Sequence, residues 1–181
     1  MRIHVRGWVV ALVLATALGA GDWYLGTFAR HPWGAARSLS APWLVLAFVA
    51  GGTQRGPKRA AALGLACTYA ALVGYGLMIL WPGGAHHLTL GEALAYLGHE
   101  RAVFLASLVT APLFGWFGWR WRDGSTIAGA LVTAAMLCLE PLARALTAHP
   151  IRFLDVALVE VVAGLALAAA VVERRRAPRR A

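Results

Sequence analysis

The sequence predicts an all-α, polytopic transmembrane bundle of about six helices with both chain termini in the cytoplasm. Of its 181 residues, 60% are hydrophobic and 14% are charged, whereas soluble domains average about 45–50% apolar and about 25% charged residues. Several apolar runs approach the ~20 residues that a helix needs to cross ~30 Å of hydrocarbon. Lys and Arg cluster between these runs, as they do in the cytoplasmic loops of membrane proteins. The predicted spans are residues 7–28, 38–52, 60–81, 101–119, 125–147 and 151–172.

The first two spans each leave an alternative open. A basic start at Arg2 and Arg6 followed by an apolar run also resembles a secretory signal peptide. The run continues past Asp22 for roughly the length of a span, which favours an uncleaved helix. Residues 38–52 cover only ~22 Å at 1.5 Å per residue, so a re-entrant segment is the alternative there. Full crossing is favoured because it places the basic cluster TQRGPKR in the cytoplasm.

The third span is rich in small residues, which let a neighbouring helix approach closely. These positions are Gly64, Ala71, Gly74 and Gly76. After it, Thr89 and Glu92 have the spacing of a helix-capping box. Leucines then recur at helical spacing, at Leu90, Leu94 and Leu97. We therefore expect residues 88–99 to form a short connecting helix in the membrane interface, with a functional lid as the alternative.

The last three spans complete the predicted topology. Pro112 interrupts the fourth span, which ends in alternating Trp and Arg residues that suit the headgroup level. Pro141 is expected to kink the fifth. Residues 173–181 form a basic cytoplasmic tail after the sixth. This layout places twelve of the 17 Lys and Arg residues inside and five outside, as the positive-inside rule predicts. The predicted location is the inner (plasma) membrane.

Several function classes have no support in the sequence. The formal net charge of +9 is explained by cytoplasmic loops, and no aromatic-interleaved basic face predicts nucleic-acid binding. Cys67 and Cys138 lie in apolar runs without metal-site spacing and are expected to be packing residues. The predicted outer loops contain His86, His87, His99 and His149. They lack the HExxH spacing of a zinc site. No nucleotide-binding or nucleophile motif occurs, so no catalytic residue, metal or cofactor is predicted.

Ionisable residues inside the predicted spans are the strongest functional lead. Each costs at least ~2.5–3.5 kcal/mol to insert and usually faces a bundle interior. At 1.5 Å per residue, Asp22, Tyr75 and Glu140 each lie ~22 Å from the inner end of their helices, and Glu160 lies ~14 Å below the outer end. These four side chains therefore fall at similar depth in the outer half of the membrane. Arg144 stands four residues after Glu140, so the two share a helix face.

These five residues form the candidate site, and two interpretations remain. In the first, Asp22, Tyr75, Glu140, Arg144 and Glu160 line a polar cup, open to the outside, that binds or helps to translocate a small solute, a cation or a proton without catalysis. In the second, the charges only hold helices together in a structural or partner-binding subunit. The expected partners are the lipid bilayer and either another membrane protein or a second copy of the chain.

Four segments resemble, in this order, an uncharacterised bacterial family of six-helix integral membrane proteins, a domain of unknown function. They are APWLVLAFVAGG, AAALGLACTYAALVGYG, PLFGWFGWRWR and LEPLARAL. The resemblance runs from Ser38 to the sixth span; the first helix and the loop with His86 and His87 match less clearly. It implies the membrane fold and no activity. A more generic likeness, in size, helix number and an outward-facing site, is to the substrate-binding components of energy-coupling-factor transporters.

Overall fold

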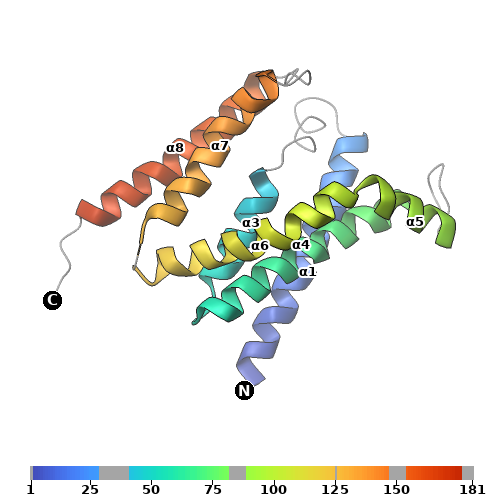
Figure 1. The fold of residues 1–181 in the computed structure, drawn as a ribbon, viewed down its shortest axis with the longest axis horizontal. Helices are drawn as coiled ribbons and strands as arrows, with labels where there is room; N and C mark the ends of the chain where they lie inside the picture. The colour runs from blue at the N-terminus through green and yellow to red at the C-terminus, as the bar shows by residue number, and fades with distance from the viewer. Residues whose placement is uncertain (1, 29–40, 82–88, 125, 147–153, 177–181) are drawn as a thin grey trace.

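The computed structural model describes residues 2–28, 41–81, 89–124, 126–146 and 154–176, and within this part of the chain all regular structure is helical. The described residues form seven helices, which confirms the all-α prediction (Figure 1). They are α1 (Arg2–Phe28), α3 (Ala41–Gly52), α4 (Pro57–Ile79), α5 (Leu90–His99), α6 (Arg101–Arg122), α7 (Ala128–Leu146) and α8 (Leu154–Arg176).

Four of these helices are long and apolar enough to cross a membrane. Their apolar stretches are Gly7–Phe28, Pro57–Ile79, Arg101–Arg122 and Asp155–Glu173. The apolar part of α7, Ala128–Ala143, is shorter. With 12 residues, α3 extends over only ~18 Å at 1.5 Å per residue. Four candidate spans indicate a multi-pass membrane protein, while the crossing of α3 and α7 and the cytoplasmic side of the termini stay predictions.

The helix boundaries differ from the predicted spans mainly where polar residues extend a helix. The start of α4 is Pro57, in the first turn, where its missing N–H costs nothing. At its other end α6 includes the Trp-Arg segment as far as Arg122, and α8 reaches Arg176, so the first part of the basic tail is helical. Pro112 lies inside a continuous α6, so the predicted interruption is wrong. Neighbouring helices let membrane helices accommodate proline.

The helices pack in two groups that share α3. In one cluster, Ala15 of α1 and Ala50 of α3 pack on α4 at Leu63, Cys67 and Ala71. The other cluster joins residues from four helices. Its buried residues are Ala47, Phe48, Ala111, Phe114, Ala130 and Val171. Figure 1 shows α7 and α8 side by side along one edge of the molecule. The shortest apolar helix, α3, therefore contributes to both clusters, and α4 also packs directly on α6.

The predicted small-residue positions of α4 allow the close packing expected of them. A Cβ on Gly74 would overlap the Thr16 carbonyl of α1. The backbone of Ala71 lies against Gly19, which is also on α1. On another face, a Cβ on Gly64 would lie 2.7 Å from the Ala111 carbonyl oxygen of α6. Without side-chain bulk, the backbones of α1 and α6 approach α4 closely. The prediction of a small-residue packing surface is confirmed.

The short helix α5 begins as predicted and rests on α4 through one tyrosine. The backbone N–H of Glu92 donates to Thr89 Oγ1 at 3.2 Å, which confirms the predicted cap. Tyr96 lies over Gly76 of α4 and donates from its hydroxyl to the Leu72 carbonyl oxygen at 3.1 Å. Burial, with the nearby Glu100 carboxylate and Tyr75, raises the pKa of Tyr96 to about 12. The phenol therefore stays protonated and able to donate at physiological pH.

Leucines form the exposed side of α5. They are Leu90, Leu94 and Leu97. This face suits the predicted position of the helix in the membrane interface, because apolar side chains there can enter the lipid while the other face stays on the protein.

Candidate functional site

The five predicted site residues lie on two pairs of packed helices. Asp22 is on α1 and Tyr75 on α4, and these two helices pack against each other. Glu140 and Arg144 are on α7 and Glu160 is on α8, and these helices form the second pair. Within the described residues, the main packing partners of α7 are α8, α6 and α3 rather than α1 or α4. A single cup lined by all five residues stays a prediction.

The register of α7 and α8 brings two of the carboxylates to the same depth. The thiol of Cys138 donates to the Val161 carbonyl oxygen at 3.7 Å, and Gly164 lies against Ala134 and Cys138, so the helices are antiparallel. From the Cys138–Val161 contact, Glu140 is two residues and Glu160 one residue toward the same end. At 1.5 Å per residue their Cα atoms differ in depth by roughly 1.5 Å.

Burial differs between these carboxylates. The Glu160 side chain is only 4% exposed, whereas Glu140 is half-buried. Arg144 follows one turn after Glu140 on α7, and its side chain lies outside the described residues, as do His86, His87 and His149. The described residues contain no group of three His, Cys, Asp or Glu side chains able to hold a metal ion.

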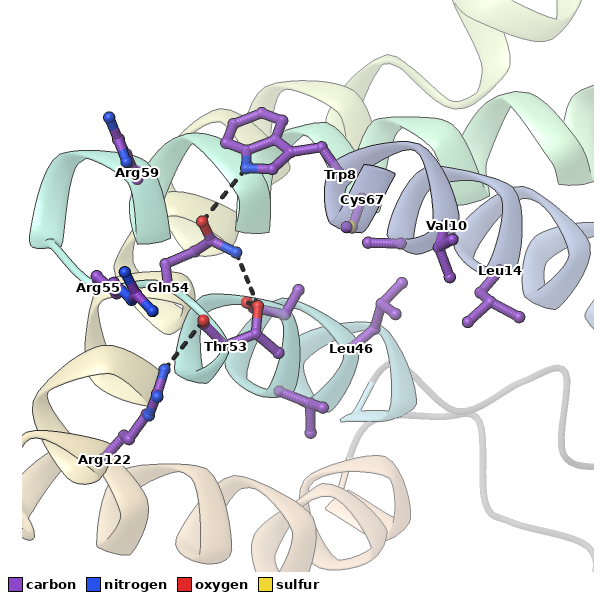
Figure 2. Close-up of a pocket in the computed structure, with 14 residues that line it drawn as sticks. Trp8, Val10, Leu14, Leu46, Thr53, Gln54, Arg55, Arg59, Cys67 and Arg122 are labelled. Carbon is purple, nitrogen blue, oxygen red and sulfur yellow. Dashed lines mark hydrogen bonds between the residues drawn. The ribbon is translucent and has the colours of Figure 1, made fainter. Parts of the chain in front are cut away.

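A pocket of about 540 Å³ lies at the opposite, arginine-rich end of the molecule, between α1, α3 and α4. Figure 2 shows its two long walls, with Val10 and Leu14 of α1 facing Leu46 of α3. Val49 and Ala50 of α3 continue the second wall. These side chains are all apolar, and the volume lies in the ~300–1,000 Å³ range of small-molecule sites.

A chain of hydrogen bonds borders the polar end of this pocket and joins α1 to α3 through the loop that follows α3. The indole N–H of Trp8 donates to Gln54 Oε1 at 3.2 Å, and Gln54 Nε2 donates to Thr53 Oγ1 at 2.8 Å. Thr53 in turn donates to the Ala50 carbonyl oxygen at 2.7 Å. Figure 2 shows this network between the start of α1 and the end of α3. It keeps a polar rim in place above the apolar walls.

Positive charge surrounds the rim. Arg55, Arg59 and Arg122 line the pocket, and its lining residues include no carboxylate. Arg122 Nη1 donates to the carbonyl oxygens of Gly52 at 3.2 Å and Thr53 at 3.0 Å. This guanidinium therefore caps the C-terminal, electronegative end of α3. Arg55 and Arg59 are exposed beside the start of α4, whose dipole is positive at this end.

Sequence reasoning missed this pocket. It treated residues 53–59 as a topology-setting loop and Trp8 as part of an apolar span. The available signal was that Trp8, Gln54 and Arg122 all fall at the same membrane end in the predicted topology. Polar and aromatic side chains at one membrane depth can together form the rim of a pocket. No local sequence pattern shows which of these side chains come into contact.

Comparison with known proteins leaves the function to be inferred from these residues. No protein-family model matches the chain, and neither a curated protein nor a solved structure matches it. The predicted likeness to a bacterial family of unknown function therefore stays a prediction.

Proposed function

We propose that this chain is a non-catalytic, multi-pass membrane protein that binds a small lipid-like molecule in the pocket between α1, α3 and α4. The observation behind the proposal is the pocket itself, about 540 Å³ with apolar walls and a hydrogen-bonded polar rim. Sites that hold small molecules combine mostly apolar lining with a few placed polar groups. A molecule with an apolar body and one polar end fits this division.

We further propose that the pocket opens at the cytoplasmic face of the inner membrane. Arg55 lies in the connection between α3 and α4 at this end, Lys58 and Arg59 lie in the first turn of α4, and Arg120 and Arg122 end α6 there. The positive-inside rule assigns such clusters to the cytoplasm, together with both termini. Arg120 also lies over the Trp116 ring, with its guanidinium carbon 5.0 Å from the ring centroid. Tryptophan at that level suits the headgroup region.

The pocket proposal is tested by filling the pocket from α1. Val9 and Val10 are neighbours with similar exposure, 53% and 56%, and only Val10 lines the pocket. We expect Val10→Trp to weaken binding of a fluorescent fatty-acyl lipid by about 15-fold, the loss from about two methylenes that no longer fit at ~0.8 kcal/mol each. Val9→Trp is the control and should leave the affinity unchanged. Equal affinities for the two variants would disprove binding in this pocket.

A second candidate function uses the carboxylates at the other end. The shared depth of Glu140 and Glu160, with Glu160 almost fully buried, supports a polar site for a small solute, a cation or a proton in the outer half of the α7–α8 pair. Arg144, on the same helix as Glu140, would belong to this site, whereas Asp22 and Tyr75 would join it only if the two helix pairs cooperate. The alternative is that these charges stabilise helix packing alone.

A thermal-shift screen separates these two interpretations of the carboxylates. The purified protein would be heated with vitamins, amino acids and organic ions over a pH series. If the carboxylates bind a solute, one compound raises the melting temperature of the wild type but not that of Glu160→Gln, and Asp22→Asn shares this loss if the two helix pairs form one site. A screen with no stabilising compound, combined with a lower melting temperature of Glu160→Gln, would instead favour a structural role.

A further inference from the structure

We propose that the molecule bound between α1, α3 and α4 is an anionic phospholipid of the adjoining leaflet. Its phosphate would lie at Arg55 and Arg59 and one acyl chain would lie between α1 and α3. This inference rests on the proposed function and narrows it to one ligand class.

The charges at the rim favour an anion. Three arginines line the pocket without a carboxylate among the lining residues, so a neutral or cationic headgroup would leave this positive field uncompensated. Arg122 is held by the carbonyl oxygens that end α3. Arg55 and Arg59, which are exposed at the rim, therefore supply the guanidinium groups for the ligand. Guanidinium forks match phosphate oxygens in geometry as well as charge.

The apolar walls favour an acyl chain over a free phosphate compound. Val10 and Leu14 of α1 and Val49 of α3 line the pocket and are also exposed on the surface of the molecule. The apolar part of the pocket is therefore a groove that is open along the surface between α1 and α3 as well as at the arginine-rich end. Since α1 is a candidate membrane span, this side opening faces hydrocarbon, and a lipid could enter laterally without leaving the bilayer.

The rim itself suits the level between headgroup and chain. Trp8 and Gln54 stand between the arginines and the apolar walls (Figure 2). Tryptophan is enriched at this interfacial depth, where one part of the ring is in lipid and the N–H meets polar groups. The order of arginine, amide with indole, and aliphatic side chains thus matches the order of phosphate, glycerol ester and acyl chain in a phospholipid.

The test measures lipid binding to the full chain by native mass spectrometry in an uncharged detergent. Phosphatidylglycerol and phosphatidylethanolamine with identical acyl chains are the probes, and glycerol phosphate serves as a chain-free competitor. We expect tighter binding of phosphatidylglycerol. Each basic residue near an anionic lipid surface contributes about fivefold, so the double variant Arg55→Gln/Arg59→Gln should lose about 25-fold for this lipid. Lys58→Gln, next to Arg59 in the first turn of α4 but outside the pocket lining, is the matched control.

Each result separates the ligand class from the pocket proposal. Loss of preference in the arginine variant, with Lys58→Gln unchanged and glycerol phosphate a poor competitor, supports the inference. If both lipids bind equally and both are lost in Val10→Trp, the pocket stands and the anionic ligand is disproved. If glycerol phosphate competes as well as the lipid, the acyl-chain assignment is overturned. If Val10→Trp and Val9→Trp bind alike, the proposed function itself is disproved.

Discussion

Replacing Gly115 with alanine is expected to lower the free energy of unfolding by about 2 kcal/mol, within the usual ~1–3 kcal/mol cost of overpacking. A Cβ at Gly115 of α6 would overlap the Ala60 carbonyl oxygen of α4 and lie 3.2 Å from Gly64 Cα. On its other side, the backbone of Gly115 lies against Gly51 of α3. Because the atoms opposing this Cβ are backbone atoms of α4, no side-chain rotation relieves the overlap, and α4 and α6 must separate.

Thermal unfolding followed through Cys67 measures this effect. Cys67 is 1% exposed and lies in the α1–α3–α4 cluster at the wall of the pocket, so a thiol-reactive fluorescent dye should label it much faster once this packing opens. In a Cys138→Ala background, Gly115→Ala should lower the labelling midpoint by about 4–8 °C. Gly21→Ala is the matched control because a Cβ there meets nothing within 4 Å. A Gly115→Ala midpoint equal to that of the control would contradict the close approach of α6 to α4.

The second large effect is expected for Gly164→Leu. This substitution should loosen the packing of α7 on α8 and leave the central helices, α1, α3 and α4, packed together. A Cβ at Gly164 would lie 2.6 Å from Cys138 Sγ and 2.8 Å from the Ala134 carbonyl oxygen. A leucine side chain there forces α8 away from α7, again at a cost of about 1–3 kcal/mol. The cluster formed by α1, α3 and α4 contains no residue of α7 or α8. The added leucine therefore makes no direct overlap with this cluster, and its packing should persist.

The two cysteines distinguish this local change from global unfolding. With Cys67 replaced by alanine, Gly164→Leu should speed dye labelling of Cys138 well below the melting temperature. With Cys138 replaced instead, labelling of Cys67 should match that of the parent protein. Ala163→Leu adds the same side chain at the adjacent, exposed position of α8 and controls for bulk. Equal acceleration at both cysteines would show that the α7–α8 pair and the central helices unfold as one unit.

Both predictions extend an expectation that the sequence supported. Gly64, Ala71 and Gly74 were expected to be contact positions because small residues in an apolar helix let backbones meet, and their contacts confirm it. The Thr89 cap was equally predictable, since the hydroxyl and the N–H that it accepts from are three residues apart. Such features depend on neighbours within one or two helical turns.

The candidate site was harder to predict because it depends on helix pairing. Rise per residue placed Glu140 and Glu160 at one depth, and the antiparallel register of α7 and α8 agrees with this. The same arithmetic placed Asp22 and Tyr75 at that depth too, but depth along the membrane normal carries no information about lateral position. The packing puts these two residues on a different helix pair.

The sequence by itself determined an all-α membrane protein, its long apolar helices, the small-residue surface of α4 and the capped start of α5, because hydropathy and spacing act over a few residues. Only the tertiary structure decided that Trp8 meets Gln54, 46 residues away, and that Arg122 caps α3 from 70 residues beyond Gly52. Those contacts create the basic, apolar-walled pocket. They arise from which helix faces pack together, and that choice is made by backbone shape and packing across the whole bundle rather than by any local pattern.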